Sequence, residues 1–303
     1  MRAWLSSVVL AVVLPACGVG TRQPIAGPPI EQVLRARPRL LWVAAHPDDE
    51  SVGGGLLGRA CIADGALCHF LVFNRGAGGE CALSDCKPDL GSVRHRELTS
   101  AARMYHATLE HYDLYNAPLP VESFPSRHEL ERRWMSDSDP AGLVARAVRR
   151  FRPDVVVTLD PYHGFTGHPE HQAAARFALA GIRLAADAAA ADAYVAGEPP
   201  YRVGIVYNVQ NQHWFMALAG DGKDPMPWNE ALLAGAGCAV RGASRRCIDV
   251  AMDNSHAHRS QQHDLDGLRA MLPFWETSYV RRLDPFGREA SDLVAELAPG
   301  SKR

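Results

Sequence analysis

The chain has 303 residues, of which 47% are hydrophobic and 22% are charged, and its formal net charge is −2. This composition suits one folded domain with a substantial apolar core and argues against a disordered chain. The near balance of acidic and basic residues argues against nucleic acid as a partner.

The first residues resemble an export signal and are not expected to be part of the fold. Arg2 precedes the apolar run 5–14, which is too short to cross a bilayer. Leu14-Pro15-Ala16-Cys17 then resembles a bacterial lipobox, so we expect a lipoprotein-type signal peptide over 1–16 and a lipid on Cys17. Simple secretion and an uncleaved N-terminus are the alternatives. Residues 17–37 are expected to hold the lipidated Cys17 and a flexible tether, and residues 38–303 one folded domain.

Six further cysteines form three pairs that are close in sequence. An exported protein folds in an oxidising compartment, where such pairs form disulfides. The alternative is a set of buried free thiols, which would leave the close spacing unexplained. We therefore predict the disulfides Cys61–Cys68, Cys81–Cys86 and Cys238–Cys247.

Expected strands alternate with expected helices along the domain. This order predicts an α/β fold of Rossmann-like type, with a mostly parallel sheet flanked by helices in a single domain. Strands are expected at 40–45, 66–74, 111–114, 154–159, 203–209 and 247–252. Helices are expected at 56–63, 93–105, 139–151, 172–190 and 256–271. The Gly-rich segment 219–244 is expected to be irregular, as either a mobile flap or a surface insertion.

A cluster of polar residues, His46-Pro47-Asp48-Asp49-Glu50, follows the first expected strand directly. Open α/β sheets place their ligands at the carboxyl ends of strands. Because adjacent residues point in different directions, one aspartate can bind a metal while its neighbour stays free to act as a base. Glu50 falls in the first helical turn, where an acid is usually structural.

A second cluster follows the strand expected at 154–159 and ends in His168-Pro169-Glu170-His171. Pro169 suits a first helical turn, and His168 and His171 are about one turn apart, so they can share a face. A His and an Asp from the first cluster, with one His from the second, give three ligands and an open position, as in catalytic zinc sites. Helix capping alone does not explain two such clusters at strand ends.

Together, residues 45–50 and 167–171 resemble the signature of the PIG-L/LmbE-like zinc-dependent N-deacetylases. Glu170 stands where that family usually has an aspartate. The resemblance covers roughly residues 38–283. Weaker matches are Asn74-Arg75-Gly76, Val93-Arg94-His95-Arg96-Glu97 and His258-Arg259-Ser260-Gln261.

The resemblance implies a role for each motif residue. His46, Asp49 and His171 would bind Zn²⁺, Asp48 would be the general base, and His168 would assist the tetrahedral intermediate or the leaving amine. The implied reaction removes an acyl group, with acetyl expected, from an amino sugar or glycoconjugate. One alternative is a zinc amidase acting on another N-acyl compound, such as an acylated peptide or antibiotic. The other is a surface lipoprotein that binds metal or sugar without turnover.

Other residues are weaker candidates. Arg75 and Asp160 are candidate substrate contacts; Arg75 is equally expected as a surface or salt-bridged residue, and Asp160 could instead orient a metal-binding histidine. His163 and His258 are lone histidines, which are more often structural groups. The expected partner is an N-acetylated sugar compound, and the expected location is the bacterial cell envelope, where a lipid anchor alone would attach the protein to a membrane.

Overall fold

The computed structural model describes residues 27–84, 86, 88–190, 192–210, 230–233, 237–240, 243–261 and 277–298. The expected signal peptide and Cys17 lie outside these residues. In the part of the chain that is described, no helix has the length and apolar character needed to cross a bilayer.

The folded domain begins earlier than the sequence predicts. Residues 30–35, which were expected to belong to the tether, form α1 (Ile30–Arg35). Ile30, Val33 and Leu34 are all at most 8% exposed, because their spacing gives the short helix one apolar face that packs into the core. The expected domain boundary at residue 38 is therefore wrong, since the domain includes α1.

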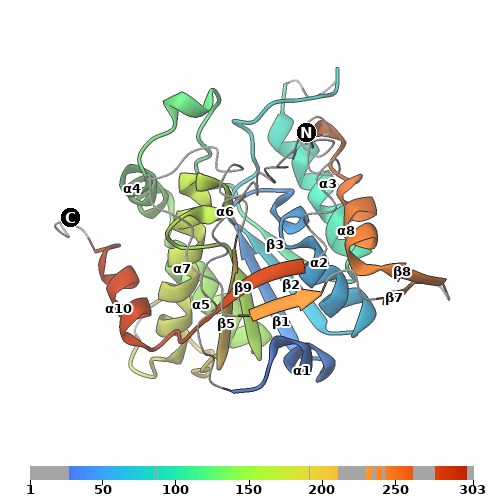
Figure 1. The fold of residues 1–303 in the computed structure, drawn as a ribbon. Helices are drawn as coiled ribbons and strands as arrows, with labels where there is room; N and C mark the ends of the chain where they lie inside the picture. Colours follow the sequence, from blue (N-terminus) through green and yellow to red (C-terminus); the bar gives the residue numbers. More distant parts are fainter. Residues whose placement is uncertain are drawn as a thin grey trace, which may run out of the picture.

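A seven-stranded sheet forms the centre of the molecule, in the order β3-β2-β1-β4-β5-β9-β6 (Figure 1). Its strands are β1 (Arg39–Ala44), β2 (Leu67–Val72), β3 (Thr108–His111), β4 (Val155–Thr158), β5 (Ile205–Gln210), β6 (Glu230–Leu233) and β9 (Thr277–Leu283). The first five in spatial order are parallel, β9 is antiparallel to β5, and β6 is antiparallel to β9. The mostly parallel sheet that the sequence predicts is confirmed.

Helices cover both faces of the sheet. The helical segments are α2 (Gly54–Leu57), η2 (Gly58–Ala63), α3 (Leu90–Met104), α4 (Arg127–Asp137), α5 (Pro140–Phe151), α6 (Gly164–Gly167), α7 (Pro169–Ala186), α8 (Cys247–Ser255) and α10 (Arg288–Ala295), with 3-10 turns η1 (Asp49–Ser51), η3 (Val121–Ser123) and η5 (Arg259–Gln261). In Figure 1, α4, α5, α7 and α10 lie on one side of the sheet and α2, α3 and α8 on the other. Trp42 and Val43 of β1 point to opposite faces, and both are fully buried in the two apolar layers.

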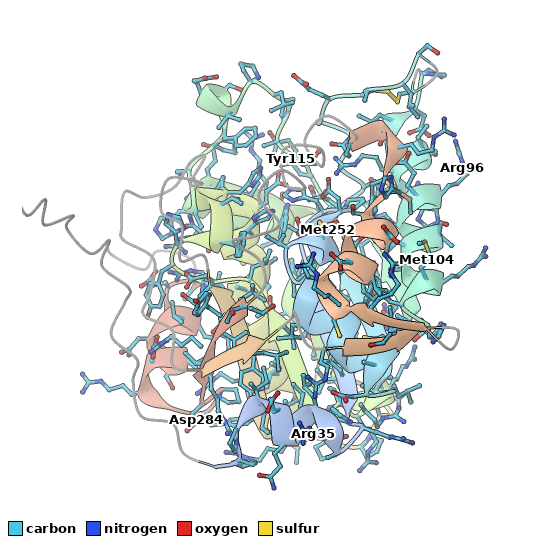
Figure 2. All side chains as sticks on the ribbon, turned by 45° about the vertical axis from the view of Figure 1, so that its right-hand side comes forward. Arg35, Arg96, Met104, Tyr115, Met252 and Asp284 are labelled. Carbon is cyan, nitrogen blue, oxygen red and sulfur yellow. A yellow bond between two sulfur atoms is a disulfide. The ribbon has the colours of Figure 1, made fainter. Side chains whose placement is uncertain are left out.

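The prediction of a strand at 247–252 is wrong, because these residues form the first part of α8. Two glycines let α8 pack closely on the helix before β2: a Cβ on Gly54 would lie 2.9 Å from Ala251 Cβ, and one on Gly58 would lie 2.8 Å from the Cys247 carbonyl. Figure 2 shows α8, with Met252 labelled, in front of α2. Tertiary packing therefore decides the local structure here.

Three other expectations need correction. The strand expected at 111–114 is β3, which ends at His111. The described part of the segment 219–244 contains β6 and a hairpin of β7 (Gly237–Val240) and β8 (Ala243–Arg246), so it is not irregular there. The helix expected at 256–271 contains only the turn η5 in its described part, and 262–271 lie outside the described residues.

Two of the three expected disulfides are present. The Cα atoms of Cys61 and Cys68 are 5.9 Å apart, and those of Cys81 and Cys86 are 6.2 Å apart, both within the usual range. Cys247 is also disulfide-bonded, whereas the side chain of Cys238, its expected partner, lies outside the described residues.

The strand order also locates the functional site. β1 lies between β2 and β4, so the connections on its two sides run in opposite directions along the sheet. Open α/β sheets bind ligands in the crevice at such a switch point, beyond the carboxyl ends of the strands. The first polar cluster follows β1 and the second follows β4, so both reach this crevice.

Candidate metal centre

The carboxyl ends of β1 and β4 bring His46, Asp49 and His171 together. His46 Nδ1 lies 3.0 Å from His171 Nε2, and Asp49 Oδ1 lies 3.0 Å from His171 Nε2 and 3.4 Å from His46 Nδ1. All three residues are buried. These atoms therefore form a compact triangle of nitrogen and oxygen donors, which we call the donor triangle.

Neighbouring groups direct the lone pairs of these atoms toward one another. His46 Nε2 is hydrogen-bonded to Glu170 Oε2, which leaves Nδ1 without a proton in the neutral ring. His171 Nδ1 donates to the Gly164 carbonyl at 2.8 Å, which likewise leaves Nε2 as an acceptor. Asp49 Oδ2 accepts two backbone N–H groups at 2.9 Å, and Oδ1 faces the triangle. Two lone pairs and a carboxylate oxygen that face one another fit a bound cation.

His168 lies beside the donor triangle. Donor atoms of His46, His168 and His171 fall within 4.8 Å of one another, so this histidine set could also hold a metal. However, His168 Nδ1 accepts the Glu170 backbone N–H at 3.2 Å and caps α7. Asp49 Oδ1 lies at 3.0–3.4 Å from both other donors and carries charge, so Asp49 suits the position of a third ligand better than His168 does.

The protonation of His168 follows from its surroundings. Burial, with His46 and His171 nearby, holds the pKa of His168 well below its ordinary value, so the ring is neutral. Because Nδ1 accepts a hydrogen bond, the ring proton is on Nε2. His168 is therefore available as a hydrogen-bond donor next to the donor triangle.

Glu170 orients His46. This carboxylate is fully buried; its Oε2 accepts from Asn74 Nδ2 at 3.1 Å and Asn116 Nδ2 at 2.9 Å, and its Oε1 accepts the Ala117 N–H at 2.6 Å. A carboxylate fixed in this way sets the tautomer and direction of a metal-binding imidazole. The sequence did not assign this role; Asn74 could have been suspected because it follows β2 at the same edge of the sheet.

Asp48 is held beside the donor triangle in an unusual conformation. Its φ is +96°, which is rare for a residue other than glycine. Its Oδ2 accepts from Arg94 Nη2 at 3.0 Å, and the same guanidinium donates to the Pro47 carbonyl at 2.6 Å and the Gly76 carbonyl at 2.9 Å. Burial, opposed by Arg94, raises the pKa of Asp48 to about 6. A carboxylate of this kind can accept a proton from water.

The charges of the metal-free site also fit a cation. Burial acts to lower the pKa of His46, but Glu170 and Asp49 outweigh it and raise the pKa to about 10. Burial acts to raise the pKa of Asp49, but His171 and His46 hold it well below its ordinary value. In the metal-free protein a proton on His46 thus balances the buried carboxylates, and a divalent cation could replace it.

Asp160 acts on His171 through the backbone. Its Oδ1 accepts the N–H groups of Tyr162 and His163 at 2.7 and 2.6 Å, and its carbonyl accepts the Gly164 N–H at 2.8 Å. These bonds shape the loop that presents the Gly164 carbonyl to His171. An orienting effect of Asp160 on His171 would therefore pass through this loop.

Two other predicted candidates have structural partners. Arg75 Nε lies 3.8 Å from Asp113 Oδ2, which favours the salt-bridged interpretation. His258 pairs with Glu50 in the interior. Phe124, which the sequence did not suggest, packs against His168 with ring centroids 4.7 Å apart.

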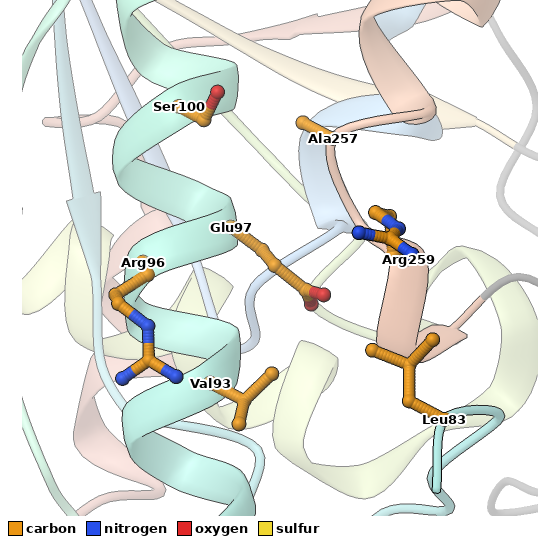
Figure 3. Close-up of a pocket in the computed structure, with 7 residues that line it drawn as sticks. All are labelled: Leu83, Val93, Arg96, Glu97, Ser100, Ala257 and Arg259. Atoms are coloured by element: carbon orange, nitrogen blue, oxygen red, sulfur yellow. The ribbon is translucent and has the colours of Figure 1, made fainter. Parts of the chain in front are cut away.

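A pocket of about 270 Å³ lies between α3 and the chain around η5, apart from the donor triangle (Figure 3). Its walls are formed by Leu83, Val93, Arg96, Glu97, Ser100, Ala257 and Arg259. Because it contains none of the triangle residues, we do not assign it to the reaction.

Comparison with known proteins identifies the domain. The model of the PIG-L family, described as GlcNAc-PI de-N-acetylase, matches residues 41–182, which include the whole donor triangle and Asp48. We call residues 41–182 the PIG-L domain, after the family model that they match. The PIG-L domain thus contains every motif residue to which the sequence assigned catalysis or metal binding.

Relatives of the PIG-L domain include named enzymes. Over 182 residues the chain is 37% identical to a 1D-myo-inositol 2-acetamido-2-deoxy-alpha-D-glucopyranoside deacetylase from Streptomyces scabiei, and the match covers 56% of each chain. The chain thus matches only about half the length of such curated relatives.

Solved structures share the fold of the PIG-L domain. An N,N'-diacetylchitobiose deacetylase from Pyrococcus horikoshii has a TM-score of 0.57 and 15% identity, covering 84% of this chain and 90% of its own. A 4-carboxy-2-hydroxymuconate hydratase from Pseudomonas putida has a TM-score of 0.52 and 18% identity, covering 82% and 96%. Because proteins with different reactions share this fold, function has to be argued from the site.

Proposed function

We propose that this chain is a zinc-dependent hydrolase that removes the acetyl group from the nitrogen of an N-acetylated amino sugar, releasing a free amine and acetate. The observation that carries the proposal is the buried donor triangle of His46, Asp49 and His171, with Asp48 held beside it.

The donor triangle suits zinc in spacing and chemistry. Tetrahedral zinc with bonds of about 2.0–2.1 Å to nitrogen and oxygen places its ligands about 3.3 Å apart. The three observed separations are 3.0, 3.0 and 3.4 Å. Two imidazoles and one carboxylate with an open fourth position form a ligand set typical of catalytic zinc. Iron or cobalt also suits these donors, so metal analysis of the purified protein decides the identity.

The substrate class is proposed from the relatives. The family description and the Streptomyces relative both name the removal of acetyl from an N-acetylglucosamine unit linked to inositol. The family match includes the residues to which we assign the chemistry. An N-acetylglucosamine-containing compound or glycoconjugate is therefore the proposed substrate class.

Each side chain of the site has its own role in the proposed reaction. A zinc ion bound here would polarise the acetyl carbonyl and lower the pKa of a water molecule toward neutrality. Asp48 takes a proton from the attacking water as its oxygen bonds to the acetyl carbon. His168 donates its Nε2 proton in a hydrogen bond to the developing oxyanion or the leaving nitrogen. When the C–N bond breaks, the proton held by Asp48 passes to the amine, which balances the reaction.

Asp48 argues against a role limited to binding. Holding a non-glycine residue in a sparsely populated backbone conformation costs on the order of 1–3 kcal/mol. A site that only bound a metal or a sugar would need neither this conformation nor a half-buried carboxylate with a raised pKa. An amidase acting on a different N-acyl compound would use the same groups, so the substrate has to be tested directly.

The test is a turnover assay on zinc-loaded protein. A panel of N-acetylglucosamine-containing compounds is incubated with the protein, and free amine and acetate are measured. We expect equal amounts of both products, loss of activity with a chelator, and recovery when zinc is added. Release from an acylated peptide but from no sugar would point to the amidase alternative, and binding of sugars without release would support the binding lipoprotein.

We also propose that the protein is exported and lipid-anchored at Cys17. The lipobox-like sequence Leu14-Pro15-Ala16-Cys17 supports this location, and so do disulfides such as Cys61–Cys68, which form in oxidising compartments. Mass spectrometry of the mature N-terminus, with detergent partitioning, tests the proposal. A soluble product that begins after Cys17 and lacks acyl mass would indicate simple secretion instead.

A further inference from the structure

A buried acid–imidazole pair lies next to Asp48. Glu50 is 2% exposed and His258 is fully buried, and Glu50 Oε1 contacts His258 Nε2. The other oxygen of the carboxylate, Glu50 Oε2, accepts the backbone N–H of Asp48 at 3.2 Å. The pair therefore acts directly on the backbone of the residue to which we assign the base.

The Asp48 backbone needs such support. A φ of +96° is strained for an aspartate, and strain of this kind persists only where the surroundings enforce it. Arg94 holds the carboxylate at 3.0 Å. Glu50 holds the N–H of the same residue, so the two contacts fix Asp48 from both sides.

His258 is itself held in place by the turn that follows it. Glu97 of α3 accepts the Ser260 N–H at 2.8 Å and the Ser260 hydroxyl at 2.6 Å. The Ser260 carbonyl accepts the Ala82 N–H at 2.8 Å, and Gln261 Nε2 donates to the Glu80 carbonyl at 2.7 Å. Figure 3 shows Glu97 reaching from α3 toward the chain that carries Arg259. A segment 208 residues away in sequence is thus fixed beside the base.

We propose that Glu50 and His258 are positioning residues: His258 fixes Glu50, and Glu50 holds Asp48 in the left-handed conformation that points its carboxylate at the reaction centre. The inference rests on the proposed function, because it assigns Asp48 as the base. Stability alone does not account for the pair, since a buried ion pair is often no more stabilising than apolar side chains of similar volume.

Two substitutions of His258 separate positioning from bulk stability. His258→Leu removes the donor to Glu50, whereas His258→Gln places an amide N–H₂ near the position of Nε2. We expect His258→Leu to keep its zinc and its KM but to lose about 10²-fold in kcat, the cost of a misplaced reacting group. His258→Gln should recover most of the lost kcat. Glu50→Gln should lose about as much kcat as His258→Leu, because its single amide oxygen cannot accept from both His258 and the Asp48 N–H.

The chain offers a matched control. His69 is also a buried histidine beside a carboxylate: its Nε2 lies 3.4 Å from Glu110 Oε1. It lies near the start of β2 (Leu67–Val72), whereas the site lies beyond the carboxyl ends of the strands. His69→Leu should lower the melting temperature without changing kcat per folded, zinc-loaded molecule. Three results would overturn the proposal. His258→Leu could keep the wild-type kcat, it could lose activity only in proportion to its zinc content or folded fraction, or His258→Gln could lose as much kcat as His258→Leu.

A crystal structure of His258→Leu tests positioning without relying on turnover. We expect Asp48 to leave the left-handed region while Asp49, which two backbone N–H groups hold, keeps its place. If the wild-type protein hydrolyses none of the substrates, the proposed function has failed, but this structure still decides about positioning. An unchanged Asp48 in the variant would overturn the inference.

Discussion

Replacing Glu170 with glutamine should weaken zinc binding, although Glu170 is not a proposed ligand. Its two carboxylate oxygens accept from His46 Nε2, from Asn74 Nδ2 at 3.1 Å, from Asn116 Nδ2 at 2.9 Å and from the Ala117 N–H at 2.6 Å. A glutamine has one amide oxygen and one amide nitrogen, so its N–H₂ group would have to face at least one of these donors.

Two independent estimates give a similar size for the effect. Substitution of a group that orients a metal-binding histidine typically costs 10–100-fold in affinity. At about 1.4 kcal/mol for each factor of ten, this is roughly 1.4–2.8 kcal/mol. Leaving one buried donor without an acceptor costs about 1–3 kcal/mol. The loss should remain smaller than that of His46→Ala, which removes a ligand.

The zinc dissociation constant of Glu170→Gln can be measured by competition with a chromophoric chelator at neutral pH. Glu170→Asp keeps the charge and should fall between wild type and Glu170→Gln, while the exposed Glu122→Gln serves as the control. Wild-type affinity in Glu170→Gln would show that the buried carboxylate does not orient His46.

Three further predictions follow from the site and the disulfides. Asp48→Asn should keep stoichiometric zinc and lose about 10²–10⁴-fold in kcat; zinc analysis and turnover check this, and a near-wild-type rate would exclude Asp48 as the base. In the metal-free protein the pKa of His46 is raised from 6.5 to about 10, so the proton on His46 stabilises the folded state. This stabilisation is complete below pH 6.5 and is lost as pH rises through about 10. The melting temperature of the metal-free protein should fall across that window while zinc affinity rises, and an affinity independent of pH would contradict this. The double substitution Cys61→Ser/Cys68→Ser should cost roughly 2–3 kcal/mol in denaturant unfolding, and no change would mean that the bridge does not restrain the unfolded chain.

The core of the site was predictable because its signals are local. His46 and Asp49 follow one apolar strand directly, and His171 begins the helix after another. Carboxyl ends of parallel strands lie at one edge of a sheet, so these residues could be brought together without knowing the remaining contacts.

The surrounding groups depend on contacts between distant segments, which no local pattern encodes. Arg94 reaches Asp48 from α3, and Asn116 reaches Glu170 from the loop after β3. The local sequence predicts only a structural acid at Glu50, in a first helical turn, since nothing near it in sequence indicates His258. The helix α8 was missed for the same reason, because its packing against glycines of α2 and η2 overrides its strand-like composition.

Every proposed catalytic role depends on one divalent metal bound between His46, Asp49 and His171. Anomalous diffraction at the zinc edge from crystals of the zinc-loaded protein tests this directly. We expect one peak within about 2.0–2.2 Å of His46 Nδ1, Asp49 Oδ1 and His171 Nε2. A peak held by the three histidines without Asp49, or no peak at this site in protein that contains stoichiometric zinc, would contradict it.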